Sequence, residues 1–266
     1  MDRRDELLRG DPITMQRLSA LTMTLTPDGP VDGLKQRNDL GPLLQGALME
    51  RVDAGYAALL HQLPFNPYSQ YCFWEEGSLV WRISALTDDA ASYIIEPARQ
   101  LDSLEVRSAR LRFEVAKTSL DTLNIESLLK DVGQAGPDKL RLQFLTPTAF
   151  KSQGRYVNIP SVRLILQNLL MHYGQVYDNN KEGYEETIEY VDQHVRVLSY
   201  SLRSSSFGHI AGGGRRIPAF VGSMTLGLRG NEMTAGLSRM LLRFGEYAGV
   251  GIKTSMGMGG IRLLTA

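Results

Sequence analysis

The segment TAGLSRMLLRFGEYAGVGIKTSMGMGGIRLL, residues 234–264, restricts the possible folds of the chain more than any other stretch. Its first part carries leucine, methionine and phenylalanine near the 3.6-residue period, which predicts an amphipathic helix over 234–247. Its last residues, 260–264, are mainly apolar and predict a short strand. Between them, 249–259 reads Gly-hydrophobic-Gly, five residues, then Gly-hydrophobic-Gly. The segment therefore predicts a helix that returns through a glycine-rich loop into a strand.

The rest of the C-terminal half supplies the partners of this helix and strand. Hydrophobic patterning predicts strands at 140–145, 195–203 and 217–229, and a helix at 159–177. An acidic stretch at 178–192 is either a solvated face or the start of another short helix. The resulting order, β-α-β-β-α-β, is the ferredoxin-like plan.

The N-terminal half repeats this plan. We expect a strand at 18–26, a helix at 40–63, a hairpin of two strands within 71–86, a helix from 88 to about 100, and a strand at 104–118. The fold class predicted is thus α+β, with two tandem ferredoxin-like (RRM-like) domains. Such a fold hosts many functions and decides none by itself.

The boundary between the two domains is predicted at VGQAGPD, residues 132–138, which combines glycine and proline between the repeats. The N-terminal domain is then 1–132, and the C-terminal domain, with the glycine-rich loop, is 137–266. A chain of 266 residues agrees with two domains of roughly 150 residues each.

Composition excludes several protein classes. A hydrophobic content of 43% with 22% charged residues argues against a disordered chain. The single cysteine, Cys72, excludes a disulfide framework and a thiolate zinc cluster and fits a reducing cytoplasm. The sequence has no apolar run of ~18 residues, and its N-terminus, MDRRDELLRGD, has no apolar core. We therefore expect a cytoplasmic protein without a membrane span or secretory signal.

Charge is divided unevenly between the chain halves, although the formal net charge is zero. Residues 196–266 contain nine lysines and arginines but only two acidic residues. Such asymmetry is a hint of a surface that binds a polyanion such as nucleic acid. On charge alone, a solvated basic surface explains the pattern equally well.

The glycine-rich loop, residues 249–259, is the sharpest motif. Glycines let a backbone approach a ligand closely and expose N–H groups, which suits phosphate binding. The loop is not a Walker loop, because its lysine follows Ile252 rather than glycine. It is not a dinucleotide fingerprint either, since Thr254 interrupts the pattern and the loop leads from helix to strand. The alternative, a merely tight turn, needs fewer glycines.

This loop resembles the C-terminal signature of the CRISPR-associated RAMP superfamily, and the rest of the chain is similar to its repeat-processing endoribonuclease. LTPTAF (145–150) and IPAFVG (217–222) are similar to segments of that family's second domain. LQGAL (44–48) through His61, followed by Pro67-Tyr68-Ser69, resembles the family's catalytic helix and its exit. The resemblance implies a metal-independent enzyme that binds CRISPR repeat RNA, cleaves precursor transcripts into guide RNAs and needs no cofactor.

The resemblance places the catalytic histidine at His61, at the predicted C-terminal end of a helix, where the helix dipole stabilises an imidazolium. The family's best-known triad of tyrosine, histidine and lysine is not reproduced: Met49 stands where the tyrosine is expected, and no lysine follows His61 within ten residues. Tyr68 is the candidate second catalytic residue, although packing beside Pro67 is an equal alternative. His209 is a less favoured candidate for a second catalytic histidine.

The residues expected to bind RNA lie in the basic C-terminal half. The Gly-Gly-Gly-Arg-Arg loop before the strand at 217–229 suggests a basic hairpin tip that enters an RNA groove, with a solvated tip as the alternative. The expected RNA-binding residues are Gly249, Gly251, Lys253, Ser255, Gly257, Gly259, Arg215 and Arg216.

Two rival functions stay open on the sequence alone. One is a non-catalytic RAMP subunit that only binds guide RNA. The other is a ferredoxin-like regulatory or small-molecule-binding module, which indifference to RNA at moderate salt would favour. Other CRISPR effector-complex subunits and a second copy of the chain, as a homodimer, are the further partners considered.

Overall fold

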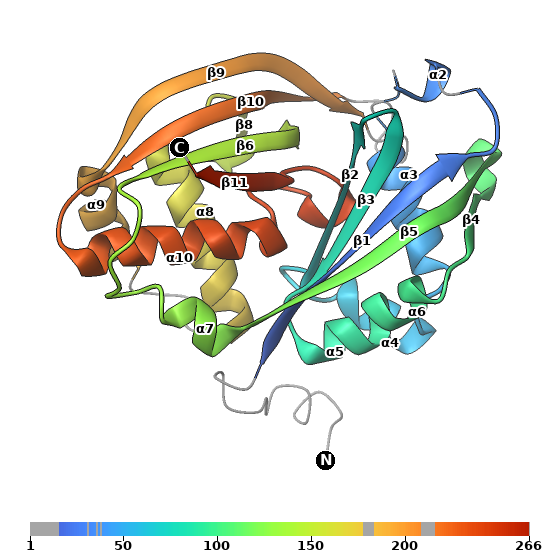
Figure 1. Ribbon diagram of the computed structural model, residues 1–266, viewed down its shortest axis with the longest axis horizontal. Coiled ribbons are helices and arrows are strands. Elements are labelled where there is room, and N and C mark those ends of the chain that lie inside the picture. Colours follow the sequence, from blue (N-terminus) through green and yellow to red (C-terminus); the bar gives the residue numbers. More distant parts are fainter. Residues whose placement is uncertain are drawn as a thin grey trace.

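The computed structural model describes residues 16–30, 32–35, 37, 39–177, 184–208 and 216–265. In this part of the chain two antiparallel sheets lie side by side, each with helices packed on it (Figure 1). None of the described helices is long and apolar enough to cross a membrane.

The first sheet has the strand order β2-β3-β1-β5-β4. Without the edge strand β4, this is the order of a ferredoxin-like sheet, with β1 and β3 in the centre. Its strands are β1 (Arg17–Pro27), β2 (Tyr68–Glu75), β3 (Ser78–Ala85), β4 (Ser103–Val106) and β5 (Leu111–Asn124). Its helices are α2 (Asp32–Lys35), α3 (Leu40–Met49), α4 (Ala54–Leu60) and the continuous run α5 (Asp88–Ala90), η2 (Ala91–Ile95) and α6 (Glu96–Arg99).

Two elements of the first half differ from the prediction. The helix expected over 40–63 is two helices, because the Asp53 carboxylate accepts the N–H groups of Gly55 and Tyr56 and thereby starts α4 anew. The strand expected over 104–118 is also two strands. Residues 107–109 form a 3₁₀ turn (η3), and Arg110 takes a left-handed conformation with φ 52°, so that β5 reverses and pairs with β4.

The second sheet has the order β11-β6-β10-β9, again the ferredoxin-like order. Its strands are β6 (Lys139–Thr148), β9 (Val195–Gly208), β10 (Arg216–Leu228) and β11 (Ile261–Thr265). The other elements are α7 (Ile125–Leu129), α8 (Val162–Tyr177), α9 (Glu185–His194), α10 (Glu232–Ala248), the 3₁₀ turn η5 (Thr254–Met256) and the hairpin of β7 (Phe150–Ser152) and β8 (Arg155–Val157).

The predicted fold class is confirmed: the chain contains two ferredoxin-like units in tandem. The helix α9 shows that part of the acidic stretch is helical, whereas residues 178–183 lie outside the described part. The hairpin of β7 and β8 was not predicted. Its turn has positive φ at Gln153 and Gly154. Turn geometry of this kind depends on a few neighbouring residues, so the pattern of apolar residues does not predict it.

Packing does not divide the chain cleanly at the proposed boundary. The core of the second unit, formed around Phe144, Leu169 and Phe244, also contains Leu18 of β1 and Leu128 of α7. Apolar side chains from before residue 132 therefore help to bury the second unit. The boundary at 132–138 stays a prediction.

Candidate active site

Strand β2 carries side chains that contact both halves of the molecule. On one face, the Gln70 amide donates to the carbonyl of Gly41 in α3 (3.0 Å) and accepts from the Trp81 indole N–H (2.8 Å). On the other face, the Ser69 hydroxyl donates to the carbonyl of Tyr247 in α10 (2.5 Å). Because adjacent residues of a strand point to opposite faces, β2 joins the first helices to the second unit.

His61 lies at the C-terminal end of α4, directly before the loop 62–67 that leads into β2. Its backbone N–H donates to the Ala57 carbonyl (3.4 Å), so the residue completes the last turn of the helix. Its side chain is exposed, as a residue that meets a polymeric substrate must be. The structure therefore agrees with the sequence in placing an accessible imidazole at this helix end.

The loop that follows His61 is held by the second unit. The Asn66 amide donates to the hydroxyl of Ser255 in the glycine-rich loop (3.2 Å). The Phe65 ring stacks on His172 of α8, with ring centroids 4.1 Å apart. The loop that follows the predicted catalytic histidine thus contacts the predicted RNA-binding loop, although Asn66 and Ser255 are 189 residues apart in sequence.

Tyr68 is buried, with 2% of its surface exposed, and belongs to the core of the first unit. Its hydroxyl lies 3.9 Å from the sulfur of Met49, the residue that stands in place of the expected tyrosine. Burial raises the pKa of Tyr68, while hydrogen bonding with Gln45 and Ser255 acts in the opposite direction. Direct contact of this hydroxyl with RNA stays a prediction, and its burial favours the packing alternative.

The glycine-rich loop is packed against protein on both sides. A Cβ at Gly251 would lie 2.2 Å from the carbonyl oxygen of Ala149, and φ there is 91°. A Cβ at Gly257 would lie 2.8 Å from Cα of Gly41, with φ 107°. Both positions therefore need glycine for backbone-to-backbone packing, independently of any ligand.

The expectation that these glycines present their N–H groups to phosphate is wrong at three positions. The Gly249 N–H donates to Gly245 (2.9 Å), the Gly251 N–H to the Asn168 side chain (2.7 Å), and the Gly259 N–H to Pro147 (3.1 Å). These three N–H groups are bound within the protein because the loop packs against residues of β6, α8 and α3. Among the predicted RNA-binding residues of the loop, Lys253 and Ser255 are half-buried and the four glycines are buried.

The start of β10 lies beside this loop. Ile217 and Phe207 form a small apolar cluster with Met258 of the loop. The neighbouring Arg216 is exposed. Arg215 and His209 lie outside the described residues.

Four side chains of this region were not among the predicted site residues: Asn66, Gln70, Asn168 and His172. Gln70 is fully buried and donates to the Ser255 carbonyl (3.2 Å) as well as to Gly41. Its signal in the sequence is a glutamine inside a mainly apolar and aromatic strand, YSQYCFW. A buried amide requires hydrogen-bond partners. The pattern of apolar residues does not show which residues those partners are.

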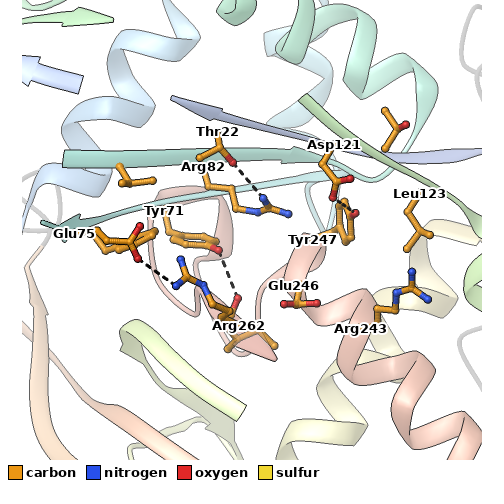
Figure 2. A pocket seen from close by; sticks show the side chains of 14 residues that line it. Thr22, Tyr71, Glu75, Arg82, Asp121, Leu123, Arg243, Glu246, Tyr247 and Arg262 are labelled. Carbon is orange, nitrogen blue, oxygen red and sulfur yellow. Dashed lines mark hydrogen bonds and ion pairs between the residues drawn. The ribbon is translucent and has the colours of Figure 1, made fainter. Parts of the chain in front are cut away.

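A separate cavity of about 350 Å³ lies between the opposite face of the first sheet and α10 and β11 (Figure 2). Arg82 donates to Thr22 (3.2 Å) and lies over the Tyr247 ring, whose hydroxyl donates to Asp121 (2.7 Å). Burial raises the pKa of Glu246, and nearby arginines oppose this shift. Cations and carboxylates line the cavity together, which makes it a polar joint between the two units.

No group of three or more histidine, cysteine, aspartate or glutamate side chains that could hold a metal ion is present among the described residues. The side chains that join the loop after His61 to the second unit are an amide, two aromatic rings and a hydroxyl. Their chemistry is that of hydrogen bonding and packing.

Comparison with known proteins relates the chain to one family of endoribonucleases. The family model of the CRISPR-associated endoribonuclease Cas6 matches residues 142–261. The Cas6 endoribonuclease of Mycobacterium tuberculosis (strain ATCC 25618 / H37Rv) is 39% identical over 260 residues, which cover 96% of this chain and 81% of the relative. That of Streptococcus thermophilus is 36% identical over 226 residues, covering 85% and 91%.

Solved structures show the same fold. A Cas6 product complex superposes with a TM-score of 0.72 at 25% identity, covering 93% of this chain and 99% of the other. A Thermus thermophilus Cas6 gives a TM-score of 0.68 at 22% identity, covering 94% and 99%. The relatives from Mycobacterium tuberculosis and Streptococcus thermophilus are 39% and 36% identical and cover 96% and 85% of this chain. The chain therefore belongs to the CRISPR-associated endoribonuclease Cas6 family.

Proposed function

We propose that this endoribonuclease cleaves CRISPR repeat RNA without a metal ion, with His61 in proton transfer. Membership in the Cas6 family makes the chain an endoribonuclease that processes CRISPR repeat RNA. The observation that carries the proposed chemistry is the exposed His61 at the end of α4, beside a loop tied to the glycine-rich loop.

The reaction needs no group outside RNA and protein. The 2′-hydroxyl attacks the adjacent phosphorus, the bond to the 5′ oxygen breaks, and the products are a 2′,3′-cyclic phosphate and a free 5′-hydroxyl. One proton leaves the 2′ oxygen and one reaches the departing 5′ oxygen, and an imidazole can serve at either place. Cations near the phosphorus stabilise the charge of the phosphorane.

Lys253 and Arg216 are the cationic side chains that we assign to the RNA backbone. Lys253 belongs to the glycine-rich loop, and Arg216 begins the strand whose next residue packs on that loop. We propose that they hold phosphates on either side of His61, while Tyr68 supports the site from within the core. The other partners, effector-complex subunits and a second copy of the chain, stay predictions.

The reaction chemistry is tested with labelled CRISPR repeat RNA from the same genome. We expect one cut per repeat in EDTA, and no cut when the nucleotide before the cut carries a 2′-deoxy sugar, because the attacking oxygen is then missing. A 2′-deoxy sugar elsewhere in the repeat is the matched control and is cut normally. Cleavage that needs a divalent cation, or that persists at the 2′-deoxy position, contradicts the proposed mechanism.

The assignment of the cationic contacts is tested by salt dependence of binding. Lys253→Ala and Arg216→Ala are each expected to weaken binding and to lower the slope of log K against log salt by about 1, since each removes one phosphate contact. Binding is measured with uncleavable 2′-deoxy repeat RNA at several salt concentrations. The control is Arg112→Ala, an exposed arginine paired with Glu114 on β5. An unchanged slope in either test variant argues against a phosphate contact by that residue.

A further inference from the structure

We infer that Asn168, His172 and Asn66 are positioning residues that fix His61 relative to RNA through a closed ring of contacts. The ring runs from the glycine-rich loop to α8, on to the loop after His61, and back to the glycine-rich loop. This inference rests on the proposed role of His61, and the experiment below separates the two.

The first contact of the ring ties the glycine-rich loop to α8. The N–H of Gly251 donates to Oδ1 of Asn168 at 2.7 Å, across 83 residues of sequence. Gly251 is buried against Ala149 and has no room to shift toward that residue. The Asn168 carboxamide is therefore held in one orientation, with its oxygen toward the loop.

The second contact lies within α8 and follows from the first. With Oδ1 occupied by Gly251, the Nδ2 group of Asn168 faces Nε2 of His172 at 3.2 Å. Because an amide nitrogen only donates, Nε2 must be the acceptor, and the ring proton of His172 is on Nδ1. Burial lowers the pKa of His172 to about 4, so the imidazole is neutral at neutral pH and keeps this hydrogen bond.

The third contact brings α8 to the loop that follows His61. The His172 ring stacks on the Phe65 ring, with an interplanar angle of 26°. His172 is buried, with 7% of its surface exposed. We therefore infer that it acts on His61 through Phe65 and the loop rather than by contact with RNA.

The last contact closes the ring. Asn66, next to Phe65, donates to the Ser255 hydroxyl, and the Ser255 carbonyl accepts from Gln70. The loop after His61 is thus fixed at two neighbouring residues, once by α8 and once by the glycine-rich loop. His61 stands at the end of the seven-residue helix α4, four residues before Phe65. We therefore expect a shift of this loop to move its imidazole.

The catalytic consequence follows from how steeply reaction rates depend on geometry. Displacing a reacting group by 1 Å costs on the order of 10²-fold in rate. The ring joins the surface that we assign to RNA to the segment that carries His61. Breaking it should lower the cleavage step and leave RNA affinity nearly unchanged.

The test compares substitutions that break the ring with substitutions that preserve it. Asn168→Leu removes the hydrogen bonds to Gly251 and His172 while keeping a side chain of similar size. Asn66→Leu removes the hydrogen bond to Ser255. Asn168→Asp still accepts from Gly251 and can accept from His172 once its ring proton moves to Nε2. Asn66→Asp can accept from the Ser255 hydroxyl, which donates as well as accepts. The leucine variants break the ring, whereas the aspartate variants restore it.

The readouts are the single-turnover cleavage rate at saturating protein and the Kd for 2′-deoxy repeat RNA. We expect the leucine variants to cleave about 10–100-fold more slowly with Kd within about threefold of the wild type. The aspartate variants should recover most of the rate. Ser238→Ala is the matched control, because it removes one buried hydrogen bond in α10 (2.9 Å, to Thr234) and should leave the rate unchanged.

Folded leucine variants that cleave at the wild-type rate would overturn the inference, as would a loss of affinity equal to the loss of rate. If Asn168→Leu does not fold, Phe65→Leu tests the same ring at a half-buried position, by removing the stacking on His172. Failure of the proposed function looks different. In that case the wild type cuts the 2′-deoxy repeat, or His61→Ala cleaves at the wild-type rate, whatever the rate of the leucine variants.

Discussion

His61→Ala is expected to lower the single-turnover rate of repeat cleavage by about 10²–10⁴-fold, the range for loss of a positioned proton-transfer group. RNA affinity should change little, because the side chain is exposed and binding is assigned to cations elsewhere. The rate is measured with labelled repeat RNA in EDTA at saturating protein. Kd is measured with the 2′-deoxy repeat, which separates chemistry from binding.

The control for this prediction is His194→Ala. His194 closes α9 and hydrogen-bonds through Nδ1 to the Tyr190 carbonyl (2.7 Å), within the second unit. Its removal should leave the cleavage rate near that of the wild type. Cleavage that persists in His61→Ala would contradict the assignment and direct the search to Tyr68 and His209. A wild type that binds but never cuts would instead favour the non-catalytic binding subunit.

Gly251→Ala is expected to lower the free energy of unfolding by about 2–4 kcal/mol, because backbone strain and steric overlap both destabilise the variant. The φ of 91° disfavours any residue with a Cβ, and the new methyl group would meet the Ala149 carbonyl at 2.2 Å. The shift needed to relieve this contact also strains the bond to Asn168. Denaturant unfolding measures the loss of stability.

Two glycines provide matched controls for that measurement. Gly154 has φ 77° but open space around its Cβ, so Gly154→Ala carries the backbone strain alone. Gly208 has open space and no left-handed φ, so Gly208→Ala should be nearly neutral. A Gly251→Ala variant no less stable than Gly154→Ala would show that the loop has room to move, contrary to the packing described above.

A loss of stability in Gly251→Ala would show that the glycine-rich loop needs glycine for packing. The sequence suggested a cradle of free N–H groups, but the Gly249, Gly251 and Gly259 amides are bound within the protein. Glycine is needed at Gly251 and Gly257 because other backbone segments pass too close for a side chain. The loop therefore has a structural role between the two units, and RNA contact by Lys253 and Ser255 stays a prediction.

Short-range patterns in the sequence predicted most of the fold. Apolar residues at periods of 3.6 and 2 gave both β-α-β-β-α-β repeats, and the glycine-rich loop pointed to the family. The errors were local: Asp53 ends one helix by capping the next, and Arg110 reverses a strand in a left-handed turn. Such capping and turn contacts act over a few residues and leave the hydrophobic period unchanged.

The sequence by itself thus determined the two repeats, the glycine-rich loop and His61 as the candidate catalytic residue. Only the tertiary structure decided that Tyr68 is buried, that the loop glycines are packed, and that Asn66 meets Ser255 across 189 residues. Periodicity reports which face of an element is buried, because that depends on spacing along one helix or strand. It does not report which distant element covers that face, because this depends on how whole sheets and helices pack together.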